Sequence, residues 1–142
     1  AVEIPPDLPS VKCRSQQIQQ VLLNLLTNAR DALNDKYPGY HADKTIRLNV
    51  TAFERDGRRW IRMTVEDHGT GIADGDLPHI FEPFYSTKPK ESGTGLGLSI
   101  SFGIVRDHHG YFEIDSQKQR YTRIHCILPV DNGWTTPSIR ED

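Results

Sequence analysis

Residues 16–33 read QQIQQVLLNLLTNARDAL, and the spacing of their apolar side chains predicts a long amphipathic helix. Apolar residues recur three and four positions apart, as one face of an α-helix requires. Ser15 precedes the run and is a candidate N-cap, because its hydroxyl can accept a hydrogen bond from a free amide of the first turn. The apolar positions are Ile18, Val21, Leu22, Leu25, Leu26, Ala29 and Leu33.

Three polar side chains of the same segment, Asn24, Asn28 and Asp31, flank the apolar face. Because successive helical residues turn by about 100°, these three follow one stripe at the edge of the core, where a helix borders a cleft. A carboxamide oxygen suits Mg²⁺, which takes one or two protein ligands and completes its shell with phosphates and water. A solvated helix edge explains a single asparagine as well, so the stripe alone leaves both interpretations open.

Two alternating segments follow and predict strands joined by a turn at Asp56-Gly57. Residues 45–54 and 61–65 each place every second apolar side chain on one face, and Asp67 continues the inward parity. A buried carboxylate needs hydrogen-bond donors, because leaving it charged and unpaired is strongly unfavourable. The glycines of Asp67-His68-Gly69-Thr70-Gly71 would let a ligand approach the backbone, although an Asx-type turn fits equally well.

Residues 69–95 are rich in glycine, proline and polar side chains, and a loop this long inside a domain is usually functional or mobile. We interpret it as a lid. Its end, Gly93-Thr94-Gly95-Leu96-Gly97, leads into a predicted helix over residues 96–109, and free amides at a helix N-terminus attract phosphate. Thr87 and Lys88 would add a hydroxyl and a positive charge. The run lacks the ending of a P-loop and does not follow a strand.

The order of the predicted elements indicates an α/β (α+β) two-layer sandwich. Two further strands, near residues 111–116 and 121–128, follow the second helix. We expect a mixed sheet of about five strands, covered on one face by about three helices. Residues 1–130 are expected to form one domain, and residues 131–142 a C-terminal tail.

The composition excludes several classes of function. Of 142 residues, 36% are apolar and 25% charged, as in one soluble globular domain. The net charge of −2 offers no basic field for nucleic acid or for direct membrane contact. No run approaches the roughly 20 apolar residues of a membrane span, so we expect a cytoplasmic location. Cys13 and Cys126 lack neighbours at metal-ligand spacing, so no zinc site is expected.

In this order, the segments resemble the ATP-binding catalytic domain of bacterial sensor histidine kinases. That family is a branch of the superfamily with the Bergerat ATP-binding fold, which includes gyrase, MutL and the ninety-kilodalton heat-shock chaperone. The resemblance covers residues 1–130. Residues 20–32 are similar to the asparagine box, 67–71 to the first glycine box, 81–88 to the phenylalanine box and 93–97 to the second glycine box.

The resemblance implies a role for each candidate residue. The residue matching Asn28 holds Mg²⁺, the one matching Asp67 receives the adenine amino group, and the last two boxes form a flexible ATP lid. Asn24, Asn28 and Lys88 are the expected catalytic residues. The expected contacts to ATP and its metal are Asn28, Asp31, Asp67, Gly69, Gly71, Ile72, Phe84, Thr87, Lys88, Gly93, Thr94, Gly95, Leu96, Gly97 and Leu98.

Two of the departures from the family pattern concern the phosphate contacts and the last hairpin. Many relatives have a basic phosphate contact where this chain has Asp31, so phosphate binding should depend more on Lys88 and the lid amides. The family often has a glycine before its last strand, but residues 116–124 contain none, a departure that concerns the last hairpin and not the ATP site.

The resemblance implies transfer of the γ-phosphoryl group of MgATP to a histidine on a helical phosphoacceptor domain, with a response regulator downstream. The parent kinase would be a homodimer, and it is either soluble or membrane-anchored. None of the six histidines is followed by an acidic residue, as the family's acceptor histidine is, so the acceptor is expected outside this chain.

Two alternatives to a kinase remain. ATP-hydrolysing relatives such as gyrase carry a glutamate at the position of Asn24, and an asparagine cannot take a proton from water at neutral pH. The asparagine at position 24 therefore favours a kinase over an ATP-hydrolysing enzyme. A non-catalytic nucleotide-sensing module is the other alternative.

Overall fold

The computed structural model describes all residues except 1, 10, 12, 86–95 and 132–142. Beyond Asp131, the predicted tail therefore lies outside the described residues. The described elements are β1 (Val2–Glu3), α1 (Ser15–Lys36), β2 (Ile46–Arg55), β3 (Arg58–Asp67), the 3-10 helix η1 (Leu77–His79), α2 (Gly97–Asp107), β4 (Tyr111–Gln117) and β5 (Tyr121–Pro129).

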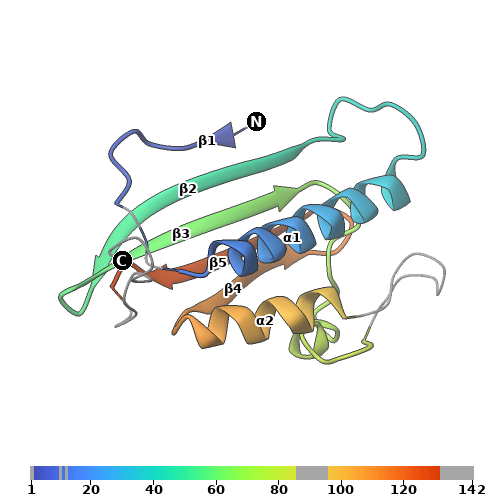
Figure 1. Cartoon of the computed structure of the whole chain (residues 1–142). Helices are drawn as coiled ribbons and strands as arrows, with labels where there is room; N and C mark the ends of the chain where they lie inside the picture. Colours follow the sequence, from blue (N-terminus) through green and yellow to red (C-terminus); the bar gives the residue numbers. More distant parts are fainter. Residues whose placement is uncertain (1, 10, 12, 86–95, 132–142) are drawn as a thin grey trace.

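The strands form one sheet with the order β1-β2-β3-β5-β4. β1 runs parallel to β2, and the other neighbours are antiparallel, so the sheet is mixed. Figure 1 shows α1 and α2 side by side over one face of this sheet. The predicted two-layer sandwich is confirmed, with two α-helices and η1 as the described helical elements. No helix in the described part of the chain is long and apolar enough to span a membrane.

Strand β3 separates two kinds of side chain onto the two faces of the sheet. Ile61, Val65 and Asp67 are buried on the face that the helices cover. Because side chains alternate along a strand, Arg62 and Glu66 lie on the opposite face. The inward parity of Asp67 is therefore confirmed.

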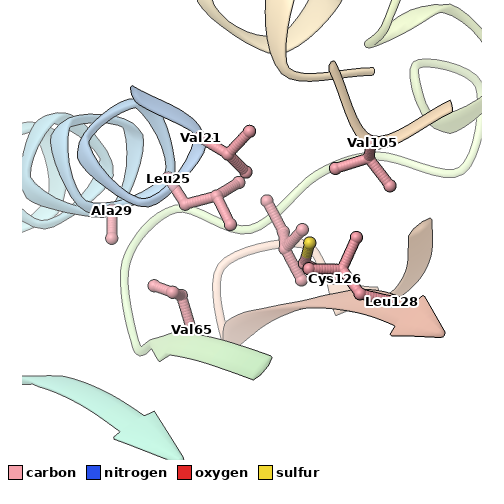
Figure 2. Close-up of a cluster of buried hydrophobic side chains, with 8 residues drawn as sticks. Val21, Leu25, Ala29, Val65, Val105, Cys126 and Leu128 are labelled. Carbon is pink, nitrogen blue, oxygen red and sulfur yellow. The ribbon is translucent and has the colours of Figure 1, made fainter. Parts of the chain in front are cut away.

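The core lies between α1, α2 and the sheet (Figure 2). Val21, Val105 and Cys126 are fully buried, so helix and strand side chains exclude water together. Burying a valine, leucine or isoleucine side chain contributes about 1.5–3 kcal/mol, so this cluster stabilises the contact between the two layers. The cluster consists of Val21, Leu25, Ala29, Val65, Val105, Ile124, Cys126 and Leu128.

The prediction that Ser15 caps the first helix is wrong. Ser15 is the first residue of α1, and Arg14 occupies the cap position without a side-chain capping bond. The buried His108 instead bridges the two helices, because its Nε2 accepts the Arg14 amide at 3.1 Å and its Nδ1 donates to the Ile104 carbonyl at 2.8 Å. Sequence spacing could not reveal this contact, since the partners lie 94 residues apart.

The β4–β5 hairpin forms without a glycine. Gln119 takes a φ of 65°, a left-handed conformation that glycine adopts more easily. Two hydrogen bonds hold the turn, since the Gln119 amide donates to the Thr70 carbonyl and Lys36 Nζ donates to the Gln119 carbonyl at 2.7 Å. The turn is thus fixed to the end of α1 and to the loop after β3.

Candidate functional site

Asp67 ends β3 beneath the helical layer and is only 4% exposed. Its Oδ1 accepts the Gly69 amide at 2.8 Å, the only hydrogen bond it receives from the described residues. Burial raises the pKa of Asp67 to about 6, against the opposing effects of the Gly69 amide and His68. A further donor from a ligand, such as an amino group, would therefore stabilise the carboxylate.

Two hydroxyl residues beside Asp67 were not singled out from the sequence. Thr122 pairs with Asp67 across the β3–β5 ladder and is 4% exposed. Its hydroxyl bonds Ser116 Oγ at 2.9 Å, and Ser116 Oγ accepts the Ile72 amide at 2.8 Å. This network joins the last hairpin to the loop after β3. The inward parity of Thr122 with Ile124 was the signal that could have identified it.

Gly69 and Gly71 allow the loop after β3 to pack against the protein's own backbone. A Cβ on Gly69 would lie 2.7 Å from the Ala32 carbonyl carbon of α1. A Cβ on Gly71, which has a φ of 70°, would lie 2.2 Å from the Gln117 carbonyl oxygen of β4. The loop is therefore confined between α1 and the β4–β5 hairpin, which fixes the backbone next to Asp67.

We expect Gly71→Ala to lower the free energy of unfolding by more than the Gly57→Ala control. Both glycines have positive φ, which costs an L-residue about 1–2 kcal/mol, but only at Gly71 would the new Cβ also meet backbone. Nothing lies within 4 Å of a Cβ at Gly57. Urea unfolding of both variants measures the difference, and equal losses would contradict the close packing of this loop.

Asn24 connects α1 to the start of α2. Its Nδ2 donates to the Gly97 carbonyl and to Ser101 Oγ, each at 3.0 Å, and its Oδ1 accepts Gln20 Nε2 at 2.8 Å. Ser101 is fully buried, so this bridge lies at the boundary of the core. With both its oxygen and its nitrogen engaged, Asn24 is suited to fix α2 against α1.

Asn28 lies one turn further along α1 and is half-buried. Its carboxamide makes no hydrogen bond to the residues that the structure describes, which leaves its oxygen available to a cation. Asp31, the third residue of the stripe, contacts Arg30 Nη2 at 3.2 Å. One half-buried carboxamide on α1 fits the way Mg²⁺ is held in nucleotide sites, with phosphates and water as its other ligands.

The predicted lid is described only in part. Thr87, Lys88, Gly93, Thr94 and Gly95 lie outside the described residues. Before them, Ile80 is buried, and the Phe81 ring packs between Phe102 of α2 and Phe112 of β4, with centroid distances of 5.2 and 5.0 Å. Phe81 therefore anchors this end of the segment, a role that the sequence pattern did not assign to it.

The structure also describes the predicted contacts Phe84, Leu96, Gly97 and Leu98. Phe84 is 74% exposed with a φ of 66°, which leaves its ring unpacked by the described residues. α2 begins at Gly97, one residue later than predicted, with Leu96 at the cap position. Leu98 packs against the core cluster. The first turn of α2 is thus held by the packing of Leu98 on the core and by the hydrogen bond from Asn24 to the Gly97 carbonyl.

Residues 13–132 match the family model described as histidine kinase-, DNA gyrase B- and HSP90-like ATPase. The chain is 42% identical over 140 residues to the two-component sensor PprA of Pseudomonas aeruginosa, covering 94% of this chain and 15% of that protein. It is 38% identical over 130 residues to the sensory histidine kinase/phosphatase NtrB of Rhizobium leguminosarum, covering 88% of this chain and 33% of that protein.

A solved structure shows the same fold. The mycobacterial sensor histidine kinase MprB aligns with a TM-score of 0.64 and 28% identity, covering 84% of this chain and 74% of that chain. Sporulation kinase E of Bacillus subtilis is 32% identical over 129 residues, which is 91% of this chain and 16% of that protein. The chain therefore spans only a minor part of the curated relatives that it matches.

Proposed function

We propose that this chain is the ATP-binding catalytic domain of a sensor histidine kinase, because it belongs to the family of histidine kinase-, DNA gyrase B- and HSP90-like ATPases. It would transfer the γ-phosphoryl group of MgATP to a histidine on a separate helical domain. The relatives that support this proposal carry the names of a sporulation kinase, a two-component sensor and sensor or sensory histidine kinases.

The adenine base would be recognised by Asp67 at the buried end of β3. Its carboxylate has one backbone donor and can accept the adenine amino group as another. Gly69, Gly71 and Ile72 would form the adjoining wall, since hydrogen bonds and close packing fix this backbone.

The triphosphate and Mg²⁺ would bind beside Asn28 and the start of α2. Asn28 would supply a metal ligand, and the metal would neutralise charge on the phosphates. The remaining phosphate and lid contacts would come from Phe84, Thr87, Lys88, Gly93, Thr94, Gly95, Leu96, Gly97 and Leu98. Phosphoryl transfer needs mainly an in-line nucleophile and charge neutralisation, so positioning is the main contribution of this domain.

The single observation that favours a kinase over a hydrolase is the residue at position 24. Water activation needs a side chain that accepts a proton, and an asparagine does not. The Asn24 side chain is moreover held between Gln20, Gly97 and Ser101. We therefore assign Asn24 to the positioning of α2 rather than to proton transfer.

The remaining features of the proposal concern the parent protein. It would be a cytoplasmic kinase domain, in a homodimeric parent, whose phosphohistidine serves a response regulator. A non-catalytic nucleotide sensor remains the second candidate, and a transfer assay separates the two.

Incubated alone with MgATP labelled at the γ-phosphate, the chain should bind nucleotide, stay unlabelled and hydrolyse ATP slowly at most. Mixed with the acceptor-bearing helical domain of its parent, it should label that domain on histidine, giving a phosphoramidate that is lost in acid and kept in base. The rate should rise with partner concentration, because separate domains lack the effective concentration of a tether. Rapid hydrolysis by the chain alone would assign it to the ATPase branch instead.

A further inference from the structure

The sheet face opposite the helices carries a groove of about 300 Å³, formed by residues of β2, β3 and β5. Three arginines, Arg47, Arg62 and Arg123, line it together with His125 and a single carboxylate, Glu66. This volume is at the lower end of the range for small-molecule sites. Because Asp67 faces the helices, the groove and the candidate nucleotide site lie on opposite faces of one sheet.

The charges in the groove are not balanced. Arg123 is paired twice, through Nε with Glu66 at 2.8 Å and through Nη1 with Asp115 at 2.9 Å. Arg47 and Arg62 form no salt bridge with any residue in the described ranges. Two guanidinium groups therefore give this face a local positive charge, although the whole chain carries a net charge of −2.

Arg62 lines the groove and carries an unsatisfied donor. Its Nε is buried and has no hydrogen-bond partner among the described residues. The guanidinium is held in place by the Phe53 ring, with Cζ 4.8 Å from the ring centroid. A buried donor without an acceptor is unfavourable, so such a group marks a position where an acceptor is expected.

His125 lies in the wall of the same groove, next to the arginines. Burial lowers its pKa first, and the charges of Arg62 and Arg123 lower it further against the opposing effects of Glu113 and Asp115. Its Nδ1 lies 2.7 Å from Thr64 Oγ1, so the ring is fixed within the groove wall. Arg62 is thus the largest single charge effect on this imidazole.

We propose that the groove binds a small phosphate-type oxyanion, either inorganic phosphate or a phosphomonoester. Guanidinium groups bind phosphate oxygens through paired, charge-assisted hydrogen bonds, and two of them would come here from neighbouring strands. A tetrahedral dianion offers more acceptor oxygens than a carboxylate and balances both unpaired charges. This site is separate from the nucleotide site and does not depend on the proposed kinase activity.

The test is a titration of the chain with inorganic phosphate at constant ionic strength, followed by NMR at the His125 imidazole and the Arg62 Nε–H. We expect saturable shifts at both groups and a rise in the pKa of His125, because a bound anion offsets the arginine charges. Arg62→Gln should weaken binding by about tenfold, the effect of losing about 1.4 kcal/mol. Arg47→Gln, at an exposed position where folding is not at risk, should also weaken it.

Arg59→Gln is the matched control, because Arg59 is exposed on the same strand but lies on the opposite face. It should leave phosphate binding unchanged. Tighter binding of glycerol phosphate than of inorganic phosphate would identify a phosphomonoester site, whereas equal binding would identify a site for the free anion. The proposal is overturned if neither His125 nor Arg62 shifts saturably, if Arg59→Gln weakens binding as much as Arg62→Gln, or if acetate binds as tightly as phosphate.

Discussion

Asn28→Leu should stop phosphoryl transfer to the histidine-bearing partner, with a loss of at least about a hundredfold in rate. Leucine has no oxygen to offer the cation, so Mg²⁺ would no longer be held against the phosphates. ATP affinity measured by calorimetry should also lose its dependence on Mg²⁺. Asn28→Asp should retain part of the metal binding, because a carboxylate oxygen can replace the carboxamide oxygen.

Asn34→Leu provides the control for this prediction, since it makes the same substitution at an exposed position of the same helix. It should preserve both the transfer rate and the dependence on Mg²⁺. Transfer by Asn28→Leu at the rate of the unchanged chain would remove Asn28 from the metal site.

Asp67→Ala should lower ATP affinity by about 1–3 kcal/mol, the cost of leaving a buried polar partner unpaired, which is about 5- to 150-fold in Kd. The unchanged chain should prefer ATP to GTP, because guanine presents a carbonyl oxygen where adenine presents an amino group. Calorimetric titration with both nucleotides measures the two effects. Equal affinity for ATP and GTP would refute the assigned role of Asp67.

Substitution of Asp67 should affect the thermal stability of the protein differently from its affinity for ATP. Burial raises the pKa of Asp67 to about 6, so the charged carboxylate is unfavourable in the nucleotide-free fold. Asp67→Ala should therefore weaken ATP binding without a matching loss of thermal stability, a combination typical of residues kept for function. Asp107→Ala, at an exposed position, should change neither property.

Periodicity predicted the features that depend on local spacing. The helical repeat identified α1, and the alternation along β3 identified Asp67 as an inward residue, because both patterns follow from backbone geometry within one element. The order of the four boxes then indicated the family. These features required no knowledge of which elements meet in space.

Contacts between distant segments were not predictable in the same way. Asn24 bonds residues more than 70 positions away, and Thr122 lies beside Asp67 only because β5 pairs with β3. The glycines after β3 suggested access for a ligand, whereas their nearest neighbours are Ala32 and Gln117. Gln119 takes a backbone conformation that its residue type does not suggest, because Thr70 and Lys36 hold it in place.

The alternation in β3 also constrains how this protein can evolve. Glu66 and Asp67 are neighbours in sequence but belong to different surfaces, so substitutions at one can be selected without altering the surface that holds the other. A single-residue insertion or deletion within β3 would exchange the two surfaces at once, turning Arg62 toward the core and Val65 toward the groove. Length changes should therefore survive selection at the Asp56-Gly57 turn, where the register on both sides is left intact.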